Sequence, residues 1–315
     1  MKLLSILLLS FYLLITTALA APTAPEKLIK LNLGYPALGT VISAQIGLVL
    51  EKTEILKIYG FDATVKGLDT EKELKTAMVS NQLDAILTSE SIFVILRGSK
   101  FEPYAISTLG SAGRLALVVK NGGPIQKLSD LKGKKIGALF GTTVHQRALE
   151  WKNKIDDKGI ELVSLASIAA LNSALQAGSV DAIMSWDPYL EDALRAKKVR
   201  LLGTSDFDLI NLLSKSYSDK NPKAIEKLNG AFIDAFYYFI THKEQVNKWY
   251  SDMLGISIDT LDAASKVNKN YNAKKLSDID IKITPAFKSN LEKVSDFLFN
   301  EKIISEKPDL NSYYK

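Results

Sequence analysis

The stretch LKTAMVSNQLDAI, residues 74–86, aligns without a gap with LNSALQAGSVDAI, residues 171–183. Each copy has the apolar spacing of a helix, then a turn, and then a strand that begins with Asp-Ala-Ile. Both strands end in polar residues, TSES at 88–91 and SWDP at 185–188, where a new helix is expected. Ligands of open α/β sheets bind at the carboxyl ends of the strands. The repeat therefore predicts two lobes of similar build that present these ends to a common space.

The alternation of strand and helix extends to the N-terminal side of the first copy. LIKLNLGY (28–35) is typical of a buried strand, VISAQIGLVLEKTEILKIYG (41–60) of a helix that Gly60 ends, and FDATVKG (61–67) of a second strand. Short apolar strands that alternate with helices indicate a parallel sheet covered on both faces. The predicted fold class is therefore α/β.

Two strand-like segments mark where the chain is expected to cross between the lobes. GRLALVVK (113–120) leaves the first lobe, and VRLLGT (199–204), followed by the polar SDFD, precedes the return. From Pro222 onward the pattern is almost wholly helical, and these helices are expected to pack on the first lobe. In residue numbers, the expected lobes are 28–115 with 208–315 for lobe 1, and 116–207 for lobe 2.

The first twenty residues have the pattern of a secretory signal peptide. Lys2 precedes a long apolar run, and Ala18-Leu19-Ala20 forms a small-x-small cleavage site. An uncleaved membrane anchor is the alternative, because the run approaches the length that spans a bilayer. The small residues at its end and Pro22 behind them favour cleavage after Ala20. We expect a soluble periplasmic protein.

Composition excludes several classes of function. The net charge of +5 over 315 residues is spread along the chain, so no basic stripe indicates a nucleic-acid partner. The chain has no cysteine, hence no disulfide, thiol nucleophile or thiolate metal site. His145 and His242 fall on different predicted helices, which argues against a histidine-rich metal site. We predict neither a metal nor a cofactor.

The stretch GALFGTTVHQRALEW (137–151) has the pattern of a helix N-terminus that binds an anion. Gly141 permits a close turn, and Thr142 or Thr143 can cap the helix that follows. The free N–H groups of its first turn would hold a sulfonate, phosphate or carboxylate. The alternative is an ordinary helix start. No lysine follows the glycine as in a Walker motif, so a nucleotide loop is not indicated.

Polar residues at the ends of the two repeated strands are further candidates for ligand binding. Trp186 offers a flat apolar face and one N–H donor, for a ligand or for packing between the lobes. Asp187 precedes Pro188 and is expected first of all to cap a helix. Ser89 can donate to an anion. Glu90 would repel an anion and favour an amine, unless it points to solvent.

Three other positions complete the predicted ligand-binding set. Tyr35 and Thr40 follow the first strand, where they can provide an aromatic wall and a polar contact. Arg114 lies near the first crossing and can meet an anion, bridge the lobes or stay on the surface. We assign no catalytic residue, because no G-x-S-x-G, H-E-x-x-H or nucleophile-base pair stands at a readable spacing.

Three segments together resemble the periplasmic solute-binding proteins of ABC importers for nitrate, sulfonates, taurine and pyrimidine precursors of thiamine. They are DLKGKKIGALFGTTVHQRALE (130–150), ALQAGSVDAIMSWDPYLEDAL (174–194) and TPAFKSNLEKVSDFLFNEKIISEKPDL (284–310). Their order and spacing extend over nearly the whole chain after residue 20. The loop PALGTVIS after the first strand is only a loose match to the family, so the resemblance does not specify the solute.

The resemblance implies a two-lobed periplasmic binding protein type 2 fold with two hinge crossings. It implies that a monomer captures a small solute and delivers it to an ABC permease and its ATPase in the inner membrane. Two alternatives remain open. Some proteins of this fold are enzymes that synthesise a pyrimidine, although they work inside the cell. Others are periplasmic sensing subunits that dock on a receptor.

Overall fold

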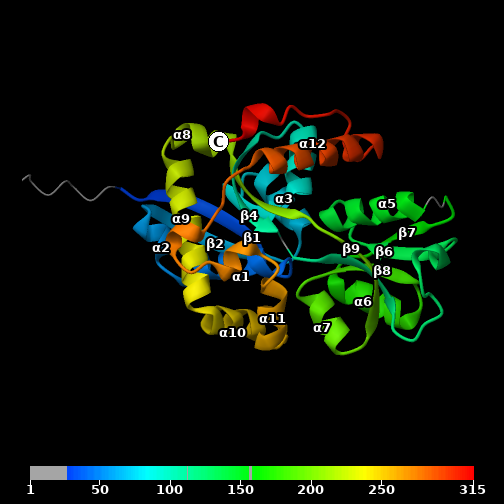
Figure 1. Cartoon of the computed structure of the whole chain (residues 1–315). Coiled ribbons are helices and arrows are strands. Elements are labelled where there is room, and N and C mark those ends of the chain that lie inside the picture. Colours follow the sequence, from blue (N-terminus) through cyan, green and yellow to red (C-terminus); the bar gives the residue numbers. More distant parts are fainter. Residues whose placement is uncertain (1–26, 112, 156–157) are drawn as a thin grey trace, which may run out of the picture.

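Two five-stranded sheets lie side by side in the computed structural model, which describes residues 27–111, 113–155 and 158–315 (Figure 1). The first sheet has the strand order β2-β1-β3-β10-β4 and the second has the order β7-β6-β8-β5-β9. The strands are β1 (Ile29–Pro36), β2 (Phe61–Leu68), β3 (Ala85–Ser89), β4 (Pro103–Ser111), β5 (Leu115–Lys120), β6 (Lys135–Ala138), β7 (Glu161–Ser164), β8 (Ala182–Trp186), β9 (Val199–Ser205) and β10 (Asp208–Ser214). The expected signal peptide, residues 1–20, lies outside the described residues.

The two sheets have the same topology. In the first sheet β1 is parallel to β2 and β3, and β10 is antiparallel to β3 and β4. In the second sheet β6 is parallel to β7 and β8, and β5 is antiparallel to β8 and β9. The repeated strands β3 and β8 hold the same central place, and every residue in both is buried. The predicted pair of similar α/β units is confirmed, but the expected parallel sheet is wrong: each sheet is mixed, because the strand that returns from the other sheet, β10 or β5, is inserted antiparallel to its neighbours.

Helices cover both faces of each sheet, which explains why the central strands β3 and β8 are buried over their whole length. Those that follow strands of the first sheet or pack on it are α1 (Val41–Lys52), α2 (Ile55–Ile58), α3 (Glu71–Val79), α4 (Glu90–Gly98), α8 (Lys215–Lys220), α9 (Ala224–Thr241), α10 (Lys243–Leu254), α11 (Ile258–Ser265) and α12 (Pro285–Asn300). Those of the second sheet are α5 (Thr143–Ile155), α6 (Ile168–Ala177) and α7 (Tyr189–Arg195). Short 3₁₀ turns occupy Leu128–Leu131, Lys269–Asn272, Leu276–Asp278 and Asn311–Tyr313.

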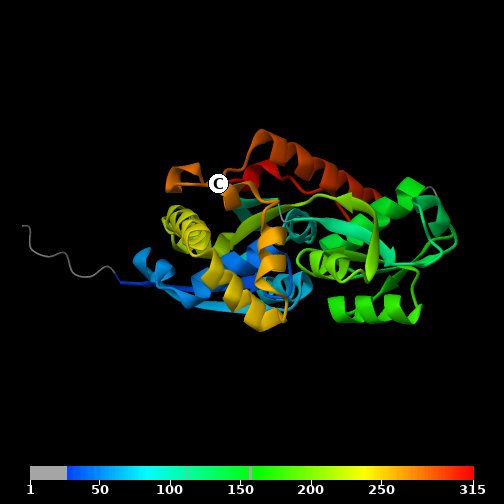
Figure 2. The same ribbon diagram turned by 60° about the horizontal axis from the view of Figure 1, so that its bottom comes forward.

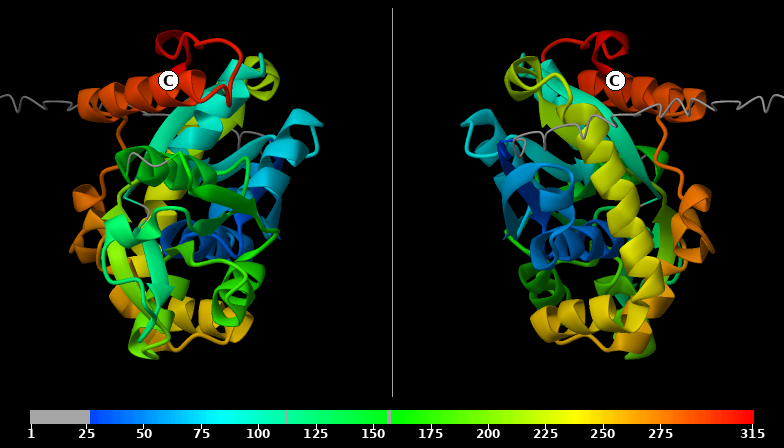
Figure 3. Two further views of the ribbon diagram at one scale, coloured as in Figure 1. Left: turned by 90° about the vertical axis from the view of Figure 1, so that its right-hand side faces the viewer. Right: turned by 90° about the vertical axis from the view of Figure 1, so that its left-hand side faces the viewer.

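The C-terminal helices pack on the first sheet's side of the molecule, as expected. Helices α9 and α10 contact α1, and α12 contacts α4. In Figure 2 these helices are yellow to orange-red, and the right panel of Figure 3 shows α9 in yellow at the front of the side away from the second sheet. Across the described ranges, no helix combines the length and the apolar character needed to span a bilayer.

The chain crosses between the sheets twice, and the two crossings are neighbours. One runs from Ser111 to Leu115 and the other from Ser205 to Asp208. Asp208 pairs with Ser111 at the end of the first sheet, and Ser205 pairs with Leu115 at the start of the second. The two connections therefore leave and enter the sheets at matching positions, which is the arrangement of a two-stranded hinge.

Two expected helices differ from the structure. The segment 41–60 is not one helix: it breaks after α1, where the Thr53 hydroxyl donates to the Val49 carbonyl at 2.7 Å. Such a bond to the preceding turn competes with the continuation of the helix. The long helix α9 begins at Ala224 rather than directly after Asn221, because Asn221 ends α8 and its carbonyl accepts the Ala224 N–H.

Candidate functional site

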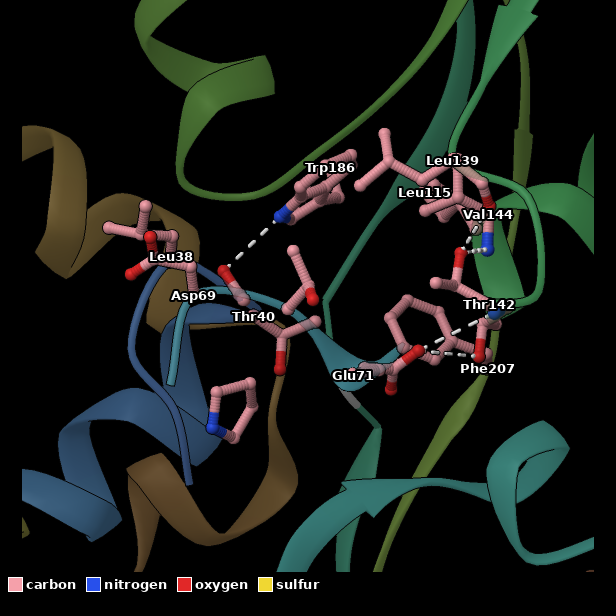
Figure 4. A pocket seen from close by; sticks show the side chains of 14 residues that line it. Leu38, Thr40, Asp69, Glu71, Leu115, Leu139, Thr142, Val144, Trp186 and Phe207 are labelled. Atoms are coloured by element: carbon pink, nitrogen blue, oxygen red, sulfur yellow. Dashed lines mark hydrogen bonds between the residues drawn. The ribbon is translucent and has the colours of Figure 1, made fainter. Parts of the chain in front are cut away.

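A cavity lies between the two sheets and is lined by both. It is bounded by the loop after β1, the loop after β2, the start of β5, the start of α5 and the end of β8 (Figure 4). The lining residues are Pro36, Leu38, Gly39, Thr40, Asp69, Thr70, Glu71, Leu115, Leu139, Thr142, Thr143, Val144, Trp186 and Phe207. The enclosed volume of the cavity is about 50 Å³. Because one water needs ~10–15 Å³ by this measure, the space suits the small polar head of a solute.

An open groove of about 750 Å³ continues outward from this cavity. The two share Thr70, Leu139 and Thr142, and the groove runs on between α3 and the segment 164–166 of the second sheet's side. Loops at the carboxyl ends of β2, β6 and β7 therefore form an entrance from solvent. This is the edge at which ligands of α/β sheets bind.

The start of α5 is built as the sequence predicts. Gly141 has a φ of +80°, which glycine adopts without strain. The Thr142 hydroxyl accepts the Val144 N–H at 3.2 Å and donates to the Leu139 carbonyl at 2.7 Å. Thr142 is thus the cap of the helix, and Thr142 and Thr143 both line the cavity, whereas Gly141 is not one of the lining residues.

The protein's own carboxylate occupies this helix terminus. Glu71, the first residue of α3, accepts the Thr143 N–H at 3.4 Å and the Thr143 hydroxyl at 3.2 Å. The Thr88 hydroxyl donates to the same carboxylate at 3.4 Å. Burial raises the pKa of Glu71, and these hydrogen bonds oppose the rise. Figure 4 shows the carboxylate pointing from the first sheet's side to the start of α5.

The start of α1 is open to a ligand instead. Its N-cap, Thr40, lines the cavity, and the Thr40 hydroxyl is 2.7 Å from the Ser43 hydroxyl rather than bonded to a backbone N–H. In the described part of the chain, the N–H groups of Val41, Ile42 and Ser43 have no hydrogen-bond acceptor. Unpaired buried N–H groups are rare in native proteins, and the positive end of a helix dipole favours an anion beside them.

Trp186 forms the wall opposite Glu71 (Figure 4). Its indole N–H donates to the Gly39 carbonyl at 3.2 Å, and its ring meets that of Tyr189 edge to face. Gly39 belongs to the first sheet's side and Trp186 to the second. The side chain therefore lines the cavity and joins the two sides, while its contact with a ligand stays a prediction.

Glu90 and Ser89 do not line the cavity. The Glu90 carboxylate is fully buried, accepts from Arg147 at 2.7 Å and from the Asp208 N–H at 2.7 Å. Burial raises the pKa of Glu90 to about 7, although Arg147 opposes the rise. The Ser89 hydroxyl bonds to the Thr143 hydroxyl. Both residues join α4 to α5, so Glu90 neither lines the cavity, as predicted, nor points to solvent, which was the alternative.

Three other predicted residues also lie outside the lining. Arg114 binds Asp187 through two nitrogens, each at 2.9 Å, and Glu191 at 2.6 Å. The Asp187 carboxylate is thereby used by Arg114, and Pro188 takes the N-cap position of α7, so the expectation that Asp187 caps this helix is wrong. Tyr35 is buried and its hydroxyl bonds to Glu51.

Asp69 and Glu71 are lining residues that the sequence did not reveal. An acidic residue in the first turn of a helix is ordinarily favoured by the helix dipole alone. Glu71 therefore looks like a typical surface residue of α3 in the sequence. The signal that identifies both is their place directly after β2, because the carboxyl ends of parallel strands face the ligand.

Relatives with assigned names align with most of the chain. A protein of Escherichia coli (strain K12), named as an aliphatic sulfonates-binding protein, is 26% identical over 240 residues, which are 73% of this chain and 72% of the relative. A protein of Bacillus subtilis (strain 168) with the same name is 28% identical over 221 residues, 68% of this chain and 63% of the relative.

Solved structures share the fold over nearly the full length. The alkanesulfonate-binding protein SsuA from Xanthomonas axonopodis pv. citri, bound to MOPS, has a TM-score of 0.76 at 15% identity, with 92% of this chain and 99% of that chain covered. SsuA from Escherichia coli has a TM-score of 0.74 at 20% identity, over 90% and 97%. The desulfurization enzyme DSZB also shares the fold, with a TM-score of 0.65 at 15% identity over 91% and 96%. The fold alone therefore does not separate binding proteins from enzymes.

The family comparison identifies the family to which the chain belongs. The family described as "ABC transporter, phosphonate, periplasmic substrate-binding protein" matches residues 54–235, more than half of the chain. The matched range contains strands of both sheets, the start of α5 and Trp186. The chain therefore belongs to this family of periplasmic substrate-binding proteins, the solute-capturing components of ABC transporters.

Proposed function

We propose that the chain captures a small organic sulfonate or phosphonate in the cavity between the sheets. The observation that carries the proposal is the start of α1, where three N–H groups without an acceptor in the described residues lie beside Thr40 in the cavity wall. Helix N-termini bind sulfonate and phosphate groups. The family and the names of both relatives support the same class of solute.

The remaining wall fits the organic part of such a solute. It is apolar and consists of Leu115, Leu139, Val144, Trp186 and Phe207. An anion therefore binds at one side of the cavity, while a short carbon chain packs against the other and extends into the groove. Thr40, Thr142, Thr143 and Trp186 are the predicted site residues that this arrangement retains.

We further propose that solute closes two lobes around a hinge. The lobes are residues 28–115 with 208–315, and residues 116–207, and the paired crossings at Ser111–Leu115 and Ser205–Asp208 support the hinge. A solute that contacts both lobes stabilises the closed form by its differential affinity. A closed monomer then delivers the solute to the permease and ATPase of the inner membrane, without chemical change to the solute.

Export by a cleaved signal peptide is part of the proposal. The pattern of residues 1–20 supports it, and the family is periplasmic. N-terminal sequencing of protein from the periplasmic fraction should give Ala21 as the first residue. A chain that begins at Met1 and sediments with membranes would contradict cleavage.

A thermal-shift screen tests the solute class. Purified protein is heated with sulfonates and phosphonates of one to four carbons, with and without amino groups, and with carboxylates and sugars as controls. A solute at 100 times its Kd should stabilise the protein by about 2.7 kcal/mol. Trp186→Ala should weaken that shift without loss of cooperative unfolding. Shifts with carboxylates or sugars, and none with any sulfonate or phosphonate, would refute the proposal.

A further inference from the structure

The two sides of the molecule also meet in a buried polar contact between α4 and α5, outside the lining of the cavity. Helix α4 follows β3 of the first sheet and α5 follows β6 of the second, so a bond between these helices joins the two sides. The Ser91 hydroxyl donates to the Gln146 side chain, and Arg147 donates to Glu90 at 2.7 Å. All four side chains are buried. This contact therefore depends on how close the two sides lie.

Glu90 belongs to a cluster with an excess of negative charge. The Asp208 N–H donates to the Glu90 carboxylate at 2.7 Å. The charged groups that act on Glu90 or on Asp208 beside it are Arg147, Glu150, Asp206 and Lys269. Arg147 also binds Glu150 at 2.7 Å, and Lys269 is exposed and forms an ion pair with another carboxylate. Three carboxylates thus share the guanidinium of Arg147, and a proton on Glu90 reduces the excess charge where burial is greatest.

Opening of the proposed hinge changes the surroundings of Glu90. In the structure its carboxylate is fully buried, and burial is the main cause that raises the pKa of Glu90 to about 7. When the lobes part, α5 and Arg147 move away and water reaches the carboxylate, so its pKa returns towards the ordinary value. The closed form therefore binds a proton more strongly than the open form, and a proton on Glu90 favours closure.

We propose that capture of the solute is coupled to the uptake of one proton by Glu90 at the α4–α5 contact. This inference rests on the proposed function and its hinge, and it goes beyond them, because Glu90 does not line the cavity. The proton comes from water when the lobes close and returns to water when they part. Affinity for the solute is therefore highest below neutral pH and falls as the pH rises through 7.

Titration calorimetry with butane-1-sulfonate tests the coupling, because a sulfonate keeps its single charge at pH 6 and at pH 8. Between pH 8 and pH 6 the affinity of the wild type should rise about ten-fold. At pH 7, in buffers of different ionisation enthalpy, the protein should take up about half a proton for each solute bound. Equal affinities at the two pH values without proton uptake would overturn the inference and leave the proposed function standing.

Glu90→Gln assigns the proton to Glu90. Glutamine resembles the protonated side chain, so the variant should bind butane-1-sulfonate at pH 8 as tightly as the wild type does at pH 6, and should lose most of the proton uptake. A merely structural defect would weaken binding at both pH values instead. Glu226→Gln, an exposed change on α9, is the matched control and should follow the wild type. A pH dependence that is unchanged in Glu90→Gln would overturn the assignment.

A distance measurement without solute separates this inference from the proposed function. The chain has no cysteine, so Lys72→Cys and Ala166→Cys together provide two specific labelling sites on opposite sides of the groove. Energy transfer between two dyes should report more of the closed form at pH 6 than at pH 8, and the difference should disappear when Glu90→Gln is added. If butane-1-sulfonate does not bind at any pH, the proposed function fails. A distance that is also independent of pH would then overturn this inference, whereas one that responds through Glu90 would support it.

Discussion

The buried ion pair between α4 and α5 leads to a sharp prediction about pH. Arg147 is shared between two carboxylates, because it binds Glu90 at 2.7 Å and Glu150 at 2.7 Å. Asp208 lies beside them, and burial raises its pKa too. The cluster therefore holds more negative than positive charge, and a proton on Glu90 relieves the excess. Burial is the main cause that raises the pKa of Glu90 to about 7, and the carboxylates of Asp208 and Glu150 add to the rise, so that Arg147 does not cancel it.

The sign and size of the effect follow from the two pKa values of Glu90. An ordinary glutamate has a pKa of 4.5, so the unfolded chain releases this proton well before the folded protein does. Stability from Glu90 is fully present below pH 4.5 and is lost as the pH rises through about 7. Each unit of difference between the folded and unfolded pKa values corresponds to about 1.4 kcal/mol, so the free energy of unfolding falls by about 3 kcal/mol.

Glu90→Gln provides the test, because glutamine keeps the shape without the charge and leaves Arg147 paired with Glu150. Melting followed by circular dichroism at pH 5 and pH 8 should show similar Tm values at pH 5 and a variant about 6 °C more stable at pH 8. Glu226→Gln, an exposed change on α9, should follow the wild type at both pH values. A variant that is destabilised at pH 8 would refute the reasoning, since it would mean that the ionised pair is net stabilising.

Three further changes test other parts of the structure. Arg114→Met should lower the free energy of unfolding by about 3–5 kcal/mol, measured by urea denaturation, because it leaves the buried Asp187 carboxylate without its cation. Gly141→Ala should lower the free energy of unfolding by about 1–2 kcal/mol in the same assay. The φ of +80° is the cause, because no atom lies within 4 Å of the added methyl group and no clash contributes. Tyr250→Phe should raise the free energy of unfolding by about 1 kcal/mol or leave it unchanged, because the buried hydroxyl has no partner among the described residues; a clear loss would reveal an undetected hydrogen bond.

The fold was predictable because its evidence is local. The repeat at 74–86 and 171–183 contains two helix-turn-strand units whose strands begin with an apolar run. A strand of that kind must be covered on both faces, so it belongs in the middle of a sheet. The structure places both in the middle of matching sheets. The start of α5 was predictable for the same reason, because a glycine and a capping threonine act on their immediate neighbours.

The site was harder to predict because its polar partners are distant in sequence. Glu90 and Arg147 are 57 residues apart, and Arg114 and Asp187 are 73 apart. Each side chain by itself looks like a candidate for ligand binding or a surface charge. Only the packing of α4 on α5 shows that Glu90 already has a partner, whereas Glu71, at the start of α3, lines the cavity. Carboxylates of similar appearance in the sequence therefore have different environments.

The contacts between the two sides of the molecule suggest how affinity is divided between the cavity and the hinge. Trp186 bonds across at the cavity wall, whereas Ser91 bonds to Gln146, and Glu90 to Arg147, behind it. In the proposed opening of the lobes, each such contact is exchanged for bonds with water, so its net contribution to closure is about 1 kcal/mol for a neutral pair. A solute shifts the equilibrium only by the difference between its affinities for the open and closed forms. Under the proposed closure, the α4–α5 contacts stabilise the closed form together with the solute, so that the affinity for the solute also depends on residues that do not line the cavity.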